Sequence, residues 1–180
     1  MKNKQYGILL TKMMLLFLID SVITYFLPYQ TGTVSIVIVP YIGLLTFCLL
    51  VLPLEHRIAY SFTFFTGLYY SIVYCDSNMI YVVLFLFAAL YIRRFIHIGA
   101  INWLEFMFYG NSTISAFELM VYFMMWITNI TEVSLTSFLL YRWIPTILFG
   151  MVSSLVIFYI YIHNLKTEEK NYDYYNQREE

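Results

Sequence analysis

The sequence has little charge. Asp, Glu, Lys and Arg make up 12% of its 180 residues, whereas a typical soluble domain carries about 25%. So few charges cannot cover the surface of a soluble globule of this size. Lys and Arg together number 10 against 11 acidic residues, so no basic excess points to nucleic acid. The composition argues against an ordinary soluble domain and against a nucleic-acid-binding protein.

Cysteine is scarce, and motifs for catalysis or metal binding are absent. The two cysteines, Cys48 and Cys75, cannot build a disulfide framework, and we interpret both as buried or idle thiols. His56, His97 and His163 stand alone, without the spacing of metal ligands. The chain has no phosphate loop, nucleophile motif or paired-carboxylate motif. We therefore expect a protein that is not an enzyme and has no cofactor and no metal.

Long uncharged runs dominate what is there. Residues 21–54, 58–75, 77–92 and 143–165 carry no charge, and 61% of the chain is hydrophobic. A membrane-spanning helix needs about 20 mostly apolar residues. The sequence therefore predicts an all-α integral membrane protein, a single domain of residues 1–165 with six spans, followed by a charged tail of residues 166–180. The predicted spans are about 6–27, 37–52, 57–74, 79–96, 113–131 and 137–162.

Pro40 is compatible with the second predicted span, because it suits the first turn of a helix, where a missing N–H costs little.

Segment 97–112 is too polar to span a membrane. Its spacing of apolar residues is typical of a short helix on the inner membrane surface. An irregular loop at 97–112 remains the alternative.

Basic residues predict the orientation. They occur before and within the first span and then in every second loop, whereas loops 28–36, 75–78 and 132–136 contain neither Lys nor Arg. Cytoplasmic loops carry the excess of Lys and Arg, so both termini are expected in the cytoplasm. The basic residues on that side are Lys2, Lys4, Lys12, Arg57, Arg93, Arg94, Lys166, Lys170 and Arg178.

Three ionisable residues fall inside spans, where they are costly and are candidates for function. Asp20 and Arg142 lie at similar predicted depths, so we expect them to pair across spans one and six. Glu118 lies in the inner part of span five, and its candidate partners end span four at a similar depth: Arg93, Arg94 and His97. Pairing that fixes helix register is the favoured interpretation. A substrate or proton path and snorkelling to the interface remain alternatives.

Small residues form a stripe on the third span. Ala59, Thr63, Gly67 and Ser71 recur at every fourth position, and Gly150 and Ser154 repeat the spacing in span six. Such a stripe lets a neighbouring backbone approach closely. We expect packing within the bundle; a contact face for another membrane protein is the alternative.

Several short segments resemble the bacterial rod shape-determining MreD family, in its divergent Gram-positive form. The resemblance rests on Leu16-Phe-Leu-Ile-Asp20, on Gly67-Leu-Tyr-Tyr-Ser71, on Phe117-Glu118 with Tyr122, and on Ser137-Phe-Leu-Leu-Tyr-Arg-Trp-Ile-Pro145-Thr146-Ile-Leu-Phe-Gly150. The last of these is similar to the final helix of that family, with its Pro-Thr step at Pro145 and Thr146. Ser71 stands where the family usually has Asp, and Gly150 where Asn is common.

The resemblance implies a non-catalytic scaffold of the machinery that builds the lateral cell wall, in the bacterial plasma membrane. The partners it implies are MreC, a RodA-type glycosyltransferase, a class B penicillin-binding protein and, in some cells, actin-like MreB. It also implies a compact bundle like that of the substrate-binding subunits of energy-coupling-factor transporters.

Such a vitamin-binding subunit is the main alternative function. It needs an outward-facing pocket of polar and aromatic groups, which Asp20, Arg142 and the cluster Tyr69, Tyr70 and Tyr74 would supply. A membrane enzyme of lipid chemistry is a third possibility, but it needs clustered acids or histidines at one depth, and the sequence has none.

Overall fold

The computed structural model describes residues 3–26, 29–31, 34–74, 80–96 and 102–176. Almost all of them are helical, which confirms the all-α prediction. The helices are α1 (Asn3–Phe26), α2 (Ile42–Val51), α3 (His56–Tyr74), α4 (Ile80–Phe95), α5 (Trp103–Ile127), α6 (Leu135–Phe138), the π-helix η1 (Leu139–Trp143) and α7 (Ile144–Asn176). A short antiparallel hairpin joins β1 (Tyr29–Thr31) to β2 (Val34–Ile36).

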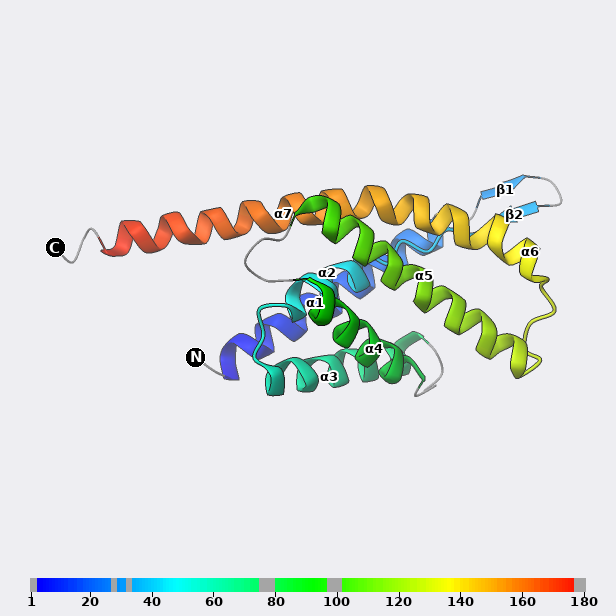
Figure 1. The fold of residues 1–180 in the computed structure, drawn as a ribbon, viewed down its shortest axis with the longest axis horizontal. Helices are drawn as coiled ribbons and strands as arrows, with labels where there is room; N and C mark the ends of the chain where they lie inside the picture. Colours follow the sequence, from blue (N-terminus) through cyan, green and yellow to red (C-terminus); the bar gives the residue numbers. More distant parts are fainter. Residues whose placement is uncertain (1–2, 27–28, 32–33, 75–79, 97–101, 177–180) are drawn as a thin grey trace.

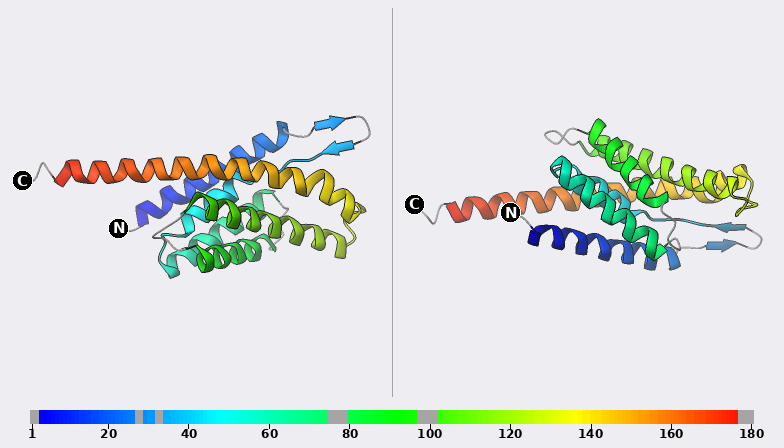
Figure 2. Two further views of the ribbon diagram at one scale, coloured as in Figure 1. Left: turned by 45° about the horizontal axis from the view of Figure 1, so that its top comes forward. Right: turned by 90° about the horizontal axis from the view of Figure 1, so that it is seen from below.

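The helices are arranged around α2. The short helix α2 contacts α1, α3, α4, α5 and α7, and most of its side chains are buried. Helix α1 begins and α7 ends at one end of the molecule, while the hairpin and α6 lie at the other (Figure 1; Figure 2). An even number of passes along the long axis explains why both ends of the chain lie on the same side.

Helices α1, α3 and α4 agree with the predicted first, third and fourth spans to within three residues. The predicted second span is wrong at its start, because the chain is extended up to Pro40 and the helix begins only at Ile42. Proline cannot donate to a helix, and it disfavours the helical conformation at the residue before it, which is Val39. Tyr41 then takes a left-handed conformation with φ 50°, which turns the chain into α2.

The predicted fifth span and the separate surface helix are also corrected. Residues 103–127 form one continuous helix, α5, and residues 97–101 lie outside the described part of the chain. Asn102 caps its start by accepting a hydrogen bond from the N–H of Leu104. Asn102 and Glu105, whose spacing suggested a surface helix, are exposed, but the same helix continues into the bundle, where Asn111 and Thr113 are buried. The side chains of Asn111 and Thr113 donate to carbonyls one turn back, while Oδ1 of Asn111 is buried without a hydrogen-bond partner among the described residues.

The predicted sixth span lies within a longer run. Helices α6, η1 and α7 follow one another without a break from Leu135 to Asn176. The tail predicted at 166–180 is therefore helical up to Asn176, and residues 177–180 lie outside the described part of the chain.

The small-residue stripe of α3 faces α4. Ala59, Thr63 and Ser71 are at most 1% exposed. A Cβ added to Gly67 would lie 2.9 Å from the backbone Cα of Val82. The two helices therefore approach closely because the third-span stripe carries almost no side-chain volume.

The second set of small residues lies between α7 and α5. Ser154 is fully buried, and a Cβ at Gly150 would lie 2.5 Å from the Oδ1 atom of Asn111. Both small-residue faces are thus occupied by helices of the same chain.

Polarity is inverted relative to a soluble protein. Large apolar side chains cover the outside of the helices, among them Phe64, Ile72, Phe87, Leu90, Met120, Phe123, Leu148, Val152 and Val156. Polar side chains are buried inside: Thr63, Thr66, Ser71, Asn111, Thr113, Glu118, Thr146, Ser153 and Ser154. Among the described residues, one helical run, Leu135–His163, is long and apolar enough by itself to cross a membrane, and most of it faces outward.

The α3–α4 contact generates the first prediction. Gly67→Ala should lower stability by about 1–3 kcal/mol, because the new methyl group meets backbone that cannot move aside alone, and Gly67→Leu should cost more. The matched control is Gly110→Ala, whose Cβ meets only the end of the Leu45 side chain. Thermal unfolding in detergent measures both. Equal tolerance of alanine and leucine at position 67 would contradict this packing.

Candidate functional site

The candidate site is built around residues 37–41, an extended segment that leads to the start of α2 at the centre of the bundle. Helix α2 has ten residues and is only ~15 Å long. Residues 37–41, which precede it, are not helical, so their N–H groups have no partners within a helix. Buried backbone groups must find partners, so other elements have to supply them.

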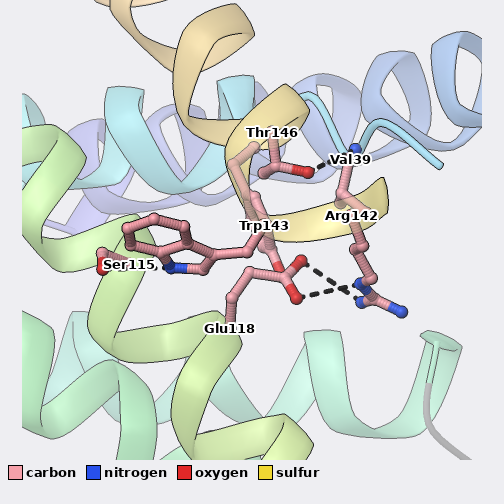
Figure 3. A network of polar contacts seen from close by, with 7 residues as sticks. Val39, Ser115, Glu118, Arg142, Trp143 and Thr146 are labelled. Atoms are coloured by element: carbon pink, nitrogen blue, oxygen red, sulfur yellow. Dashed lines mark hydrogen bonds and ion pairs between the residues drawn. The ribbon is translucent and has the colours of Figure 1, made fainter. Parts of the chain in front are cut away.

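The Pro-Thr step supplies two of these partners. Pro145 has no N–H for the carbonyl four residues earlier, and that carbonyl, of Tyr141, accepts a hydrogen bond from the N–H of Val37 at 3.0 Å. The Oγ1 atom of Thr146 accepts from the N–H of Val39 at 3.2 Å (Figure 3). Pro145 and Thr146 together therefore dock the extended segment onto the start of α7.

Asp20 supplies the next two. Its carboxylate accepts hydrogen bonds from the N–H groups of Ile42, at 2.9 Å, and Gly43, at 2.6 Å. These are the first N–H groups of α2, which have no partner inside the helix, and a negative charge also suits the positive end of the helix dipole. Gly43 permits this approach, because a Cβ there would lie 2.9 Å from Asp20 and 2.5 Å from the Phe17 ring.

Glu118 holds the last residue of the segment. The hydroxyl of Tyr41 donates to Oε1 of Glu118 at 2.9 Å. The same carboxylate, fully buried, accepts from Arg142 through Nε at 2.9 Å and Nη2 at 3.2 Å (Figure 3). This two-bond geometry is the strong form of an arginine–carboxylate pair, and it joins α5 to η1 with Tyr41 attached.

The predicted Asp20–Arg142 pair is therefore wrong, because Arg142 pairs with Glu118. The depth assigned to Glu118 was wrong because the true fifth helix begins at Trp103, ten residues earlier than predicted. Of the partners proposed for Glu118, Arg93 instead donates to the carbonyls of Val51 and Leu54 at the end of α2. His97 lies outside the described residues.

A π-helical turn positions Arg142. Residues 139–143 form η1, and the N–H of Ile144 reaches back five residues to the carbonyl of Leu139. Such turns occur often at functional sites. Next to Arg142, the indole N–H of Trp143 donates to the Ser115 hydroxyl at 3.2 Å, a second tie between η1 and α5 (Figure 3).

Two cavities flank Arg142. The larger, here called the central cavity, has a volume of about 430 Å³. It is lined by Phe17, Asp20, Ser21, Tyr25, Val39, Tyr41, Tyr70, Tyr81, Val121 and Arg142. The second has a volume of about 350 Å³ and lies between α5, η1 and the 131–133 segment, with Glu118 and Arg142 in its wall. Val121 and Arg142 line both.

The central cavity brings together part of the pocket expected from the sequence. Asp20, Arg142 and Tyr70 line it, whereas Tyr69 stacks on Phe17. The side chain of Tyr74 is outside the described part. Sequence reasoning missed Tyr41 and Tyr81, because no local signal marks either residue. A signal did exist for the carbonyl of Tyr141: Pro145, four residues later, has no N–H to bond it.

The chemistry available here is recognition through charge, hydrogen bonds and aromatic rings. Within the described ranges, no group of three or more His, Cys, Asp or Glu residues lies close enough to hold a metal ion. The thiol of Cys48 is fully buried in α2, while Cys75 is not described. No family model, curated protein or solved structure matches the chain.

The Glu118–Arg142 pair generates the second prediction. Arg142→Leu should destabilise the protein by about 3–5 kcal/mol, because it leaves a fully buried carboxylate without its cation. Glu118→Leu should cost less, since the Arg142 side chain is 35% exposed and can turn toward water. The double variant should recover part of the loss. A double-mutant cycle by unfolding in detergent measures the coupling, and the Asp20/Arg142 cycle, which should be nearly additive, is the control.

Thr146 generates the third prediction. Thr146→Val keeps the shape but leaves the N–H of Val39 without its acceptor, so stability should fall by about 1–3 kcal/mol. Thr63→Val is the matched control: the Thr63 hydroxyl, also buried, donates to the carbonyl of Ala59 within its own helix. The same melting assay compares them. A larger loss at position 63 would show that Thr146 does not anchor the extended segment.

Proposed function

We propose that the chain is a multi-span membrane protein that acts as a non-catalytic scaffold of the lateral cell-wall machinery in the bacterial plasma membrane. The observation that carries the membrane part is the inverted polarity. Apolar side chains face outward on the described helices while Thr, Ser, Asn and Glu side chains are buried. In water an exposed apolar surface of this extent is unfavourable, whereas in lipid it is the expected exterior.

The distribution of charge supports six passes with both ends in the cytoplasm. Arg57, Arg93 and Arg94 belong to the end of the bundle where α1 begins and α7 ends (Figure 1). The opposite end has the hairpin and the exposed Glu132, and its loops contain no Lys or Arg. This asymmetry follows the rule that positive charge stays inside. Helix α4 has only 16 residues, and α3 contains Arg57 and several Tyr, Thr and Ser residues, so neither qualifies as a span by its own length and hydropathy. Packed as a bundle with α7, they share its apolar exterior.

The scaffold role is supported by how the charged groups are used and by the resemblance to the MreD family. Asp20 holds the start of α2, while Glu118 and Arg142 hold α5 to η1. All three side chains therefore hold helices of this chain in place, which is what a rigid scaffold for other membrane proteins requires. Because the small-residue faces are occupied within the chain, partner helices would contact the outer apolar faces instead. The proposed partners are MreC, a RodA-type glycosyltransferase and a class B penicillin-binding protein, with MreB in some cells.

The topology is the fourth prediction. In a variant with Cys75 replaced, a cysteine at Glu132 should react with an impermeant thiol reagent in intact cells. A cysteine at Glu55, equally exposed at the other end, should react only after the membrane is opened. Labelling at Glu55 in intact cells would contradict the proposed orientation.

The scaffold is tested by purification, which is the fifth prediction. The tagged chain, extracted from its own membrane in mild detergent, should retain the wall-synthesis proteins named above, and its depletion should round the cells. An unrelated six-span protein carrying the same tag is the control. Retention of no wall protein, together with normal cell shape on depletion, would reject the role.

A second candidate function is the substrate-binding subunit of an energy-coupling-factor vitamin transporter. It is favoured by one observation, the cavity lined by Asp20, Arg142 and aromatic side chains. In that case the purified chain should carry a vitamin and an energising module in place of wall proteins, and depletion should abolish vitamin uptake without a change of shape.

A further inference from the structure

We propose that the central cavity binds a small monocarboxylate with an aromatic body, held by the open edge of the Arg142 guanidinium. The inference rests on the second candidate function, small-molecule binding, and names the ligand class; it is independent of the scaffold role. The observation behind it is that Arg142 lines the cavity and that Glu118 occupies only some of its hydrogen-bond donors.

Arg142 has hydrogen-bond donors left over. A guanidinium carries five N–H groups. Glu118 accepts from Nε and Nη2, and no hydrogen bond from Nη1 is found among the described residues. The Tyr41 hydroxyl is a further nearby partner of the guanidinium. One guanidinium nitrogen points away from Glu118 (Figure 3). Glu118 therefore orients the guanidinium, as a fixed carboxylate behind a recognition arginine, and leaves its other edge for a ligand.

A carboxylate is the group that fits this edge. Two N–H groups in a planar fork match two carboxylate oxygens. Non-helical backbone within a membrane protein occurs where it is buried or lines a polar cavity, and the extended segment contributes Val39 and Tyr41 to this wall. Binding sites of membrane proteins are often formed by such broken helices.

The remaining wall sets the body of the ligand. The ring of Tyr70 contacts the rings of both Phe17 and Tyr81, with centroids 5.2 Å apart in each pair. Tyr25, which also lines the cavity, is 79% exposed. Aromatic pairs of this kind favour an aromatic guest. The volume of about 430 Å³ is within the usual range for small-molecule sites.

Asp20 restricts the ligand to one negative charge. Its oxygens are directed at the start of α2, whose dipole offsets about half a charge. A second acidic group on the ligand would enter a cavity with this carboxylate in its wall, where like charges repel strongly at low dielectric. The site should therefore prefer a monoanion over a dianion.

The experiment uses the full chain in a maltoside detergent, which carries no charge. Binding of phenylacetate is measured by calorimetry and compared with phenylacetamide, the neutral analogue of the same shape, with the dianion phenylmalonate, with the cation benzyltrimethylammonium and with octanoate. Phenylacetate should bind at least tenfold more tightly than phenylacetamide and the cation, because charge-assisted hydrogen bonds to one carboxylate are worth about one to two powers of ten. It should also bind more tightly than phenylmalonate, whose second charge meets Asp20, and than octanoate, which has no ring for the aromatic wall. Octanoate distinguishes a free aromatic acid from a lipid-type fatty acid.

Variants locate the site. Tyr81→Leu should weaken phenylacetate binding about tenfold and Tyr81→Phe about twofold or less. Tyr91→Leu, in the same helix but away from the cavity, should leave binding unchanged. The double variant Glu118→Leu/Arg142→Leu removes the pair without leaving a lone buried charge and should abolish binding. If it does not fold, the two Tyr81 variants and the ligand series still decide.

Each other outcome overturns the proposal. Equal binding of phenylacetamide removes the role of the arginine edge, and tighter binding of benzyltrimethylammonium reverses the charge assignment. Tighter binding of octanoate assigns the cavity to a lipid chain, and an unchanged affinity in Tyr81→Leu places the ligand elsewhere. No binding by any probe rejects this ligand class, whereas rejection of the second candidate function itself requires that no vitamin and no energising module co-purify.

Discussion

The structure depends on satisfying the backbone polar groups of one segment that is not helical at the centre of the bundle. Residues 37–43 have to enter an apolar interior and start a helix there, and each N–H without a partner would cost about 1–3 kcal/mol. Three elements solve this problem together. Tyr141 and Thr146 accept from the extended backbone, and Asp20 accepts from the first N–H groups of α2. Because α2 touches every other long helix, fixing its start fixes the bundle.

The buried ion pair belongs to the same arrangement. Glu118 accepts from both Arg142 and Tyr41. A buried ion pair by itself often adds little net stability, but this one links α5, η1 and the extended segment. The π-helical turn and Pro145 both break the regular hydrogen bonding of one helix, and the freed groups are used by another part of the chain. Glu118 binds one side of the Arg142 guanidinium, and the other side faces the central cavity. The cavity lies beside residues 37–41, where the chain is extended because α2 begins only at Ile42.

Several features were accessible from local sequence. Helices α3 and α4 coincide with uncharged runs, and α1 with a mostly apolar stretch, so predicting them needed only hydropathy and charge. The four-residue spacing of Ala59, Thr63, Gly67 and Ser71 needed only helix geometry. Errors arose where a residue's environment outweighed its local preference. Asn102, Glu105 and Tyr109 made residues 97–112 look like a surface helix, but they belong to one helix whose next turn, with Asn111 and Thr113, is buried in the bundle. Pro40 is compatible with a first helical turn, yet the partners offered by Tyr141 and Thr146 made an extended approach possible.

The sequence by itself determined the helical class, the apolar runs, the separation of basic residues from the loops at the other end and the identity of the three charged residues inside those runs. These are properties of local composition and of one helix at a time, so they do not depend on which helices meet. Only the tertiary structure decided that Arg142 pairs with Glu118, that Asp20 caps α2 and that Tyr41, Tyr70 and Tyr81 share one cavity. Those pairings depend on the depth of each helix and its rotation about its own axis, which are set by packing between segments as far as 107 residues apart in the chain.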